Sequence, residues 1–253
     1  NEKTSALYTD VSLMTANENI AKEAAEVFNC LSTGRLVEES NYLLVSPLTL
    51  RKSVIKMMDK EILKAKNGED AFVGAKLNSL TDKVLINKLI ECSKAGVKVW
   101  LVIRGICCLI PGINGVTDNI TVVSIVGRYL EHARFYMFGA DEDTRKVYIS
   151  SADFMTRNTI RRVEVAAPVF DKEIKARIID MFNMMMSDNI KARVLGSDGI
   201  YIKRTPDGED VINAQEYFYH EAVTKARLKE SSDTKALKPS FLQKIINLFR
   251  RKK

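Results

Sequence analysis

Two apolar stretches flank a helical pattern near the middle of the chain, and this arrangement limits the folds that the chain can adopt. Residues 71–77 and 97–103 are predicted to be strands, and the second (VKVWLVI) is apolar apart from Lys98. Between them, Thr81 is expected to cap a helix that ends at Gly96. A strand, a helix and a second strand in this order form a crossover unit with parallel strands. The sequence therefore predicts an α/β fold.

The second half of the chain adds strands that follow one another too closely for helices to lie between them. They are expected at residues 120–126, 135–138, 146–151 and 162–169, and two smaller strands surround the Asp198-Gly199 turn. This spacing predicts that the sheet is mixed or antiparallel in this half. Further helices are expected at residues 17–31, from Ser46-Pro47 to Gly68, from Asp171 through 186, and at 213–229.

The formal charge of +7 is distributed unevenly. Residues 222–253 hold ten Lys and Arg against two Asp and Glu, whereas the preceding residues hold 29 against 30. A general nucleic-acid-binding face makes a whole domain basic, so we expect no nucleic-acid partner and favour a local anion site. The tail contains FLQKIINLF at 241–249, followed by four basic residues. This segment is equally compatible with peripheral contact with an anionic membrane and with a disordered end.

The four cysteines are Cys30, Cys92, Cys107 and Cys108, and their spacing is not that of metal ligands. We expect buried thiols in a reducing compartment, which indicates a cytoplasmic protein. No apolar run approaches the length of a membrane span. The first residues form neither a signal peptide nor an initiator methionine, so the chain is expected to be a fragment of a longer polypeptide.

His132 is one of only two histidines, and arginines surround it in the sequence. A histidine among guanidinium groups suits a site that handles phosphate, because positive charge disfavours its protonation as a general base but attracts anions. Arg104 directly follows the apolar strand at 97–103, where ligands gather in α/β sheets. A lone arginine is more often a surface residue, but this position favours phosphate binding. The other histidine, His220, lies among three aromatic residues and is interpreted as structural.

Several motifs occur together in this chain: VIRGICCL, SIVGRYLEHARF, SSADFMTRNTIRRVEV, LYTD near the start and NAQE near the end. Together they resemble the C-terminal part of bacterial polyphosphate kinase over residues 1–220. The resemblance implies a phospholipase D-like α/β fold, with a mixed sheet flanked by helices on both faces. It also implies three parts: a closing segment of the preceding phospholipase D-like domain (1–40), a C-terminal phospholipase D-like domain (41–228) and a basic, flexible tail (229–253).

The resemblance implies reversible transfer of the ATP γ-phosphate to the end of polyphosphate. In the family this reaction passes through a phosphohistidine on an upstream domain, so the fragment alone is expected to lack autophosphorylation. Tyr8, Arg104 and His132 match positions that contact ATP, and His132 is the catalytic candidate. The arginines expected to line a phosphate channel are Arg128, Arg134, Arg157, Arg161 and Arg162. ATP or ADP is the expected nucleotide, Mg²⁺ is expected to be held mainly by upstream residues, and the full-length protein is expected to form a homo-oligomer.

The chain departs from the wider phospholipase D pattern. Arg134 replaces its lysine, Gly139 stands where the aspartate would be, and residues 150–153 replace the last element. These losses argue against a phospholipase D-type phosphodiesterase, which is the third hypothesis. The second hypothesis is a non-catalytic module that binds polyphosphate or nucleotide.

Overall fold

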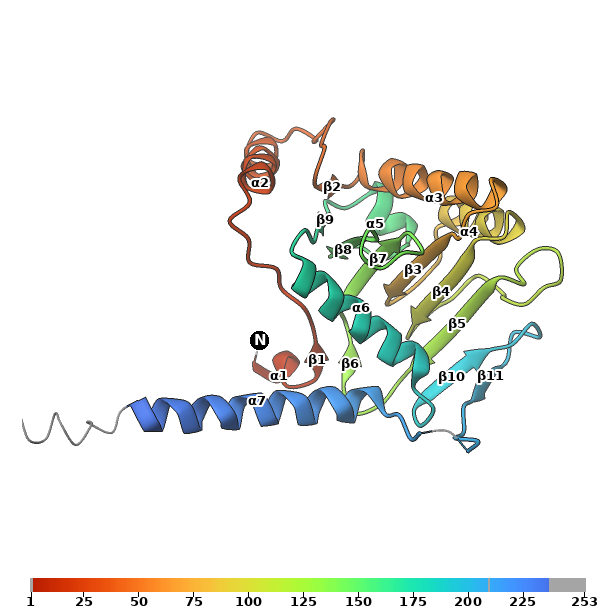
Figure 1. Cartoon of the computed structure of the whole chain (residues 1–253). Helices are drawn as coiled ribbons and strands as arrows, with labels where there is room; N and C mark the ends of the chain where they lie inside the picture. Colours follow the sequence, from red (N-terminus) through yellow and green to blue (C-terminus); the bar gives the residue numbers. More distant parts are fainter. Residues whose placement is uncertain (1, 209, 237–253) are drawn as a thin grey trace, which may run out of the picture. The chain divides into compact units, whose positions relative to one another are not determined.

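The computed structural model describes residues 2–208 and 210–236 and divides the chain into two compact units, 1–212 and 213–253. The larger unit is built on a nine-stranded sheet (Figure 1). The strands, in order across the sheet, are β11 (Tyr201–Lys203), β10 (Ala192–Leu195), β5 (Ile120–Ile125), β4 (Lys98–Ile103), β3 (Phe72–Leu77), β7 (Arg134–Phe138), β8 (Lys146–Ser150), β9 (Val165–Pro168) and β2 (Leu44–Val45).

The centre of the sheet is parallel, as the crossover pattern predicts. β3 pairs with β4 from Phe72 opposite Lys98 to Leu77 opposite Ile103, and β4 pairs with β5 in the same direction. The connecting helix α4 (Lys83–Lys94) contacts β4. The other strand pairs of this nine-stranded sheet are antiparallel. The prediction of a mixed sheet is therefore confirmed.

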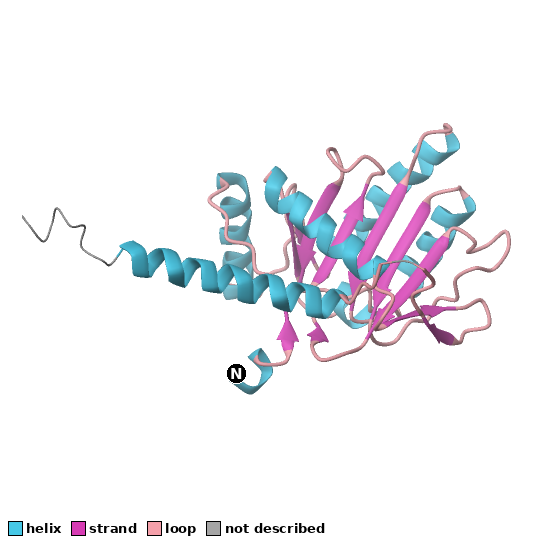
Figure 2. Ribbon diagram, turned by 60° about the horizontal axis from the view of Figure 1, so that its bottom comes forward, coloured by secondary structure: helices cyan, strands magenta, loops and turns pink. Residues whose placement is uncertain are grey.

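Helices cover both faces of the sheet (Figure 2). Helix α3 (Leu50–Lys66) and α4 share one core cluster with alternate residues of β4, namely Val99, Leu101 and Ile103. Helix α6 (Lys172–Ser187) lies on the opposite face and contacts β4 from there. Successive side chains of a strand point to opposite faces of the sheet. A strand that is buried on both faces is therefore predominantly apolar along its length.

A second sheet of two strands joins the start of the chain to its middle. Strand β1 (Tyr8–Thr9), which follows the short helix α1 (Glu2–Ser5), pairs in parallel with β6 (Leu130–Glu131). Tyr8 lies opposite Leu130, and Thr9 lies opposite Glu131. Residues that are more than 120 positions apart in the sequence are thereby brought side by side. The chain then continues into helix α2 (Glu18–Ser32), which Asn17 caps.

Two predicted helix starts are wrong. Ser46 does not begin α3: its hydroxyl donates to the carbonyls of Asn158 and Arg162, and the helix starts at Leu50. Asp82, rather than Thr81, caps α4 and accepts from two backbone N–H groups of the first turn.

On α2, the packing stripe consists of Ile20, Val27 and Cys30, and Phe28 is 72% exposed. Two further expectations differ from the structure. Helix α5 (Thr156–Ile160) occupies a segment that was not predicted to be helical. Cys108 is exposed, whereas Cys30 and Cys92 are buried as expected.

The second unit is described through helix α7 (Ala214–Ala236). This helix carries the exposed His220, whose ring nitrogen lies 4.0 Å from a carboxylate oxygen of Glu216. It continues seven residues beyond the predicted end at 229, and the amphipathic segment expected at 241–249 lies outside the described residues. No described helix is both long and apolar enough to cross a membrane.

Candidate phosphate-binding site

The candidate residues meet at one edge of the large sheet because of the strand directions. β3 and β4 are parallel and end at this edge, so the residues that follow them, Asn78 and Arg104, lie there. β7 is antiparallel to β3 and begins at the same edge, at Arg134. β8, which is antiparallel to β7, ends near Asp153. Polar groups from four strand ends therefore surround His132.

Tyr8 and His132 are held together by the small sheet. The N–H of His132 donates to the carbonyl of Thr9 at 3.1 Å, and the N–H of Leu130 donates to the carbonyl of Leu7 at 2.8 Å. The centroids of the Tyr8 and His132 rings are 4.9 Å apart, with the planes tilted by 59°. Tyr8 is 40% exposed, so part of this residue is accessible to a ligand.

The imidazole of His132 has two charged neighbours. Its Nδ1 lies 2.7 Å from a carboxylate oxygen of Asp10, and since an ionised carboxylate can only accept, Nδ1 carries the proton of this bond. The Nη1 of Arg134 lies 3.4 Å from Nδ1 and 3.2 Å from Nε2. The guanidinium of Arg134 is thus close to both ring nitrogens. Asp10 contacts Nδ1, so Nε2 is the nitrogen that can interact with other partners.

Arg134 is fixed by a buried carboxylate. Its Nε and Nη2 lie 3.3 and 3.2 Å from the two oxygens of Asp153, a two-pronged pair. Asp153 is 4% exposed and also accepts from the backbone N–H of Asn78 at 2.6 Å. This side chain therefore joins the end of β3 to the start of β7.

Arg104 is anchored through one nitrogen only. Its Nε donates to the side-chain oxygen of Asn78 and, at 2.9 Å, to the carbonyl of Glu131. Within the described part of the chain, its terminal NH₂ groups have no recorded hydrogen bond or ion pair. Burial lowers the pKa of Arg104 from its ordinary value, while the carboxylate of Asp153 acts in the opposite direction. A guanidinium held in this way presents its fork to a ligand, which suits a phosphate.

A glycine allows the two strand ends to approach each other. The N–H of Gly105 donates to the carbonyl of Asn78 at 2.9 Å. A Cβ at this position would lie 2.7 Å from the same carbonyl oxygen, closer than real Cβ contacts. Gly105 therefore permits the close approach that places Arg104 beside Asn78.

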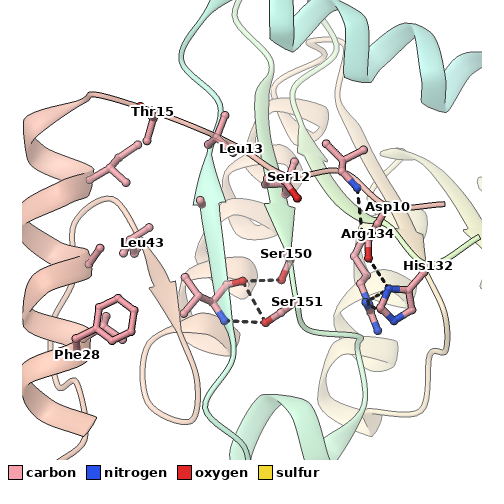
Figure 3. Close-up of a pocket in the computed structure, with 17 residues that line it drawn as sticks. Asp10, Ser12, Leu13, Thr15, Phe28, Leu43, His132, Arg134, Ser150 and Ser151 are labelled. Carbon is pink, nitrogen blue, oxygen red and sulfur yellow. Dashed lines mark hydrogen bonds and ion pairs between the residues drawn. The ribbon is translucent and has the colours of Figure 1, made fainter. Parts of the chain in front are cut away.

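A cavity of about 530 Å³ opens beside the site (Figure 3). Asp10, His132 and Arg134 lie at one side of it, whereas Phe28 and Leu43 lie at the other. Most of the remaining wall, from α2, β8 and β9, is apolar. Only the side with His132 and Arg134 suits a polyanion, because an apolar wall offers it neither donors nor positive charge. Tyr8 and Arg104 do not line this cavity.

The other predicted channel arginines are exposed. Arg128 lies 5.1 Å from the centroid of the Tyr129 ring, and Arg157 is on α5, followed by Arg161 and Arg162. Within the described residues, no recorded hydrogen bond or ion pair joins the side chains of Arg157, Arg161 or Arg162 to His132. Their place in a phosphate channel stays a prediction.

The described residues do not fit a magnesium site. Among residues 2–208 and 210–236, no group of three or more His, Cys, Asp or Glu side chains is arranged to hold a metal ion. The carboxylates nearest to His132 already serve other partners, since Asp10 binds His132 and Asp153 binds Arg134.

Sequence reasoning missed Asp10, Asn78 and Asp153. Each acts through a partner at least 19 positions away, so no local pattern reveals its role. Two weak signals exist. Asp10 closes the LYTD motif, and Asp153 is an acidic residue between apolar neighbours at the end of a strand.

Comparison with known proteins identifies the family. Residues 43–215 match the family model described as polyphosphate kinase C-terminal domain 2, and residues 1–37 match polyphosphate kinase C-terminal domain 1. The polyphosphate kinase of Staphylococcus haemolyticus is 48% identical over 223 residues, which cover 88% of this chain and 31% of the relative. The chain spans about a third of the length of the curated relatives that it matches.

A solved structure agrees with this match. The crystal structure of polyphosphate kinase from Porphyromonas gingivalis superposes with a TM-score of 0.83 at 35% identity, over 90% of this chain and 35% of that one. A phospholipase D family member, Nuc from Salmonella typhimurium, is also found, with a TM-score of 0.44 at 15% identity over 61% of this chain and 97% of that one. The resemblance inferred from the motifs is confirmed: the chain belongs to the polyphosphate kinase family.

Proposed function

We propose that this chain is the nucleotide-binding C-terminal region of an enzyme that transfers the γ-phosphate of ATP reversibly to the end of polyphosphate. The observation that carries the proposal is the convergence of Tyr8, Arg104 and His132 at one sheet edge. Tyr8 and His132 are in ring contact, and Arg104 binds the carbonyl of the residue before His132. The family match supports the choice of ATP and polyphosphate as substrates.

Each of the three side chains has a distinct role in the proposed reaction. The exposed side of Tyr8 packs against the nucleotide, and the terminal NH₂ groups of Arg104 bind oxygens of the phosphate chain. As the imidazolium, His132 donates its Nε2–H to an oxygen of the phosphate in transfer or protonates it, while Asp10 holds the Nδ1–H. The acceptor histidine that becomes phosphorylated belongs to another domain of the complete protein.

Positioned donors are the main contribution that this chain makes to catalysis. In a loose phosphoryl-transfer transition state, charge spreads over the equatorial and leaving oxygens, and fixed donors stabilise it. One such donor contributes about 2–4 kcal/mol. Bound Mg²⁺ would neutralise negative charge on the phosphate in transfer. We assign its protein ligands to other parts of the protein, because the described residues provide no cluster for it.

The test is made in the complete enzyme that contains this chain. His132→Ala is expected to lower kcat for polyphosphate synthesis by about 100-fold or more, as the loss of a transition-state donor does. His220→Ala is the matched control, because His220 is exposed on α7, and it is expected to retain the normal rate.

A His132→Ala enzyme that makes polyphosphate at the normal rate would contradict the catalytic role. If this enzyme retained its rate but bound ATP more weakly, the chain would act only as a nucleotide-binding module.

A further inference from the structure

The backbone on either side of His132 is held by an unusual set of side chains. Three consecutive carbonyls each accept a hydrogen bond from a different residue near the sheet edge. Arg104 Nε donates to Glu131 at 2.9 Å, Asn78 Nδ2 donates to His132 at 3.3 Å, and Lys76 Nζ donates to Ala133 at 2.8 Å. The segment 131–133 is therefore attached to the ends of β3 and β4 at three successive points.

The opposite side of the same segment is also fixed. The N–H groups of His132 and Ala133 both donate to the carbonyl of Thr9, at 3.1 and 3.2 Å. The side chain of Glu131 accepts from the Thr9 hydroxyl at 3.2 Å and lies 3.5 Å from Lys76 Nζ. Lys76 thus reaches both neighbours of His132, one through its carboxylate and the other through its carbonyl.

Lys76 is buried to an extent that a lysine seldom reaches. It is 1% exposed and Glu131 is 4% exposed, and both lie beneath the site rather than in it. Removing two charges from water costs several kcal/mol per ion, and an apolar pair of similar volume is often as stable. Stability alone therefore does not explain an ammonium at this position, whereas its directed bonds to the His132 segment do.

We propose that Lys76 is a positioning residue that sets the orientation of the His132 imidazole, and that Asn78 supports it from the neighbouring carbonyl. Lys76 does not reach a substrate, because it is buried. It acts by fixing the backbone of residues 131 and 133, so that the ring stays against Asp10 and Tyr8. This inference rests on the proposed function in one respect: the proposed function gives the orientation of the ring its catalytic purpose.

The charge of Lys76 has a second consequence. It balances Glu131, and Arg104 and Arg134 are the other charged groups that act on it. Without Lys76, the Glu131 carboxylate would lose its ion pair with the ammonium, next to a site that binds anions. A charge-balanced variant can therefore separate the loss of positioning from the loss of this ion pair.

The test uses the isolated chain without ligand and follows His132 by NMR. Lys76→Met and the double variant Lys76→Met/Glu131→Gln are compared with Lys98→Met, which removes a positive charge from the exposed start of β4. Both Lys76 variants are expected to lose the single Nδ1–H tautomer in the ring nitrogen shifts and to weaken the Tyr8–His132 cross-peaks at least two-fold. Lys98→Met is expected to match the wild type.

A second variant covers the case in which the Lys76 substitutions prevent folding. Asn78→Ala keeps Lys76 and removes the bond to the His132 carbonyl, and the same change in His132 is expected with a smaller amplitude. The proposal is overturned if folded variants at position 76, or Asn78→Ala where those do not fold, keep the wild-type tautomer and Tyr8 contact. A lower unfolding midpoint with an unchanged ring would have the same meaning, since it would make Lys76 a purely structural residue.

A separate measurement distinguishes this outcome from failure of the proposed function. Tripolyphosphate is titrated into the wild type and the double variant, with an expected loss of affinity of at least ten-fold in the variant. If the wild type does not bind tripolyphosphate but the ring still depends on Lys76, the positioning role stands and the proposed ligand is wrong. If the wild type binds and the double variant binds equally well with its ring disordered, the catalytic purpose of the positioning is wrong.

Discussion

Arg104, which is half-buried, and Arg145, which is buried, lie at opposite edges of the sheet. Their guanidinium nitrogens have different partners. At the edge where β3 begins, Arg145 donates Nε to Gly139 and Nη2 to Ala140, both at 2.7 Å, and Nη1 lies 3.2 Å from Glu142. Its guanidinium also lies 4.5 Å from the centroid of the Phe72 ring. Arg145 is 6% exposed and every nitrogen of its guanidinium has a partner.

Arg104, at the other edge, is anchored through Nε alone. Its terminal groups have no recorded partner within the described residues. A buried cation with a partner on every nitrogen holds the fold together, whereas a cation anchored at one nitrogen is available to a ligand.

Arg104→Ala is expected to have the largest effect on function. Removal of this phosphate donor should lower kcat/KM for ATP in the complete enzyme. The decrease should correspond to a loss of about 2–4 kcal/mol in transition-state stabilisation. The measurement is steady-state kinetics beside chemical denaturation of the variant. An unchanged kcat/KM with a large loss of stability would place Arg104 in the same class as Arg145.

Arg145→Ala is expected to show the opposite pattern. The carbonyls of Gly139 and Ala140 would lose their donors, so the free energy of unfolding should fall by about 2–3 kcal/mol. Denaturant titration of the isolated chain measures this change, and tripolyphosphate affinity should stay at the wild-type level. Weaker binding without a loss of stability would break the comparison.

The stability of the chain should depend on pH through Lys76. Burial lowers the pKa of Lys76 to about 8, while Glu131 acts in the opposite direction. Between pH 8 and about 10.4 the unfolded chain keeps a proton that the folded chain has lost, so stability should rise with pH in this window. The contribution has a maximum slope of about 1.4 kcal/mol per pH unit.

This contribution is measured as the difference between the wild type and Lys76→Met in denaturant titrations across pH 7–11. The difference removes the effects of the other titrating groups that the two proteins share. A difference that does not change with pH in this range would show that Lys76 keeps an ordinary pKa.

Asp10→Asn should have a smaller effect. The substitution replaces the carboxylate that binds Nδ1 with a neutral amide. Loss of a charge-assisted hydrogen bond at a half-exposed position should lower the free energy of unfolding by about 1 kcal/mol. The expected result is a mixture of His132 tautomers in the nitrogen shifts and a few-fold lower kcat in the complete enzyme. Retention of one tautomer would assign its selection to Arg134 instead.

Replacement of the exposed arginines should have the smallest effect. Arg157→Ala, Arg161→Ala and Arg162→Ala should each change the free energy of unfolding by less than about 0.5 kcal/mol, because all three side chains are exposed. If they line a phosphate channel, each should also weaken polyphosphate binding a few-fold, and the loss should shrink as salt is added. Binding that does not change at low salt would remove them from the channel.

The parts of the fold that depend on neighbouring residues could be predicted from the sequence. The pattern of residues 71–103 predicts β3, α4 and β4 and their parallel pairing, because each segment contains its own periodicity. The start of α3 could not be predicted, since Ser46 bonds to carbonyls more than 110 positions away.

The site follows the same rule. Arg104 could be selected because a strand end is visible in the sequence, and His132 because histidine is rare in this chain. The roles of Asp10 and Lys76 could not be inferred, because each depends on a contact between distant strands. For Lys76, the available signal was a lysine inside a strand that is otherwise apolar, which indicates an internal partner.

The most direct test of the account is a titration of the isolated chain with ATP and, separately, with tripolyphosphate, followed through the His132 imidazole by NMR. The account predicts that both ligands shift the His132 signals, that Arg104→Ala weakens the response and that Arg145→Ala does not. If neither ligand shifts His132 in the folded wild-type chain, the site is not formed by these residues alone, and the central claim is contradicted.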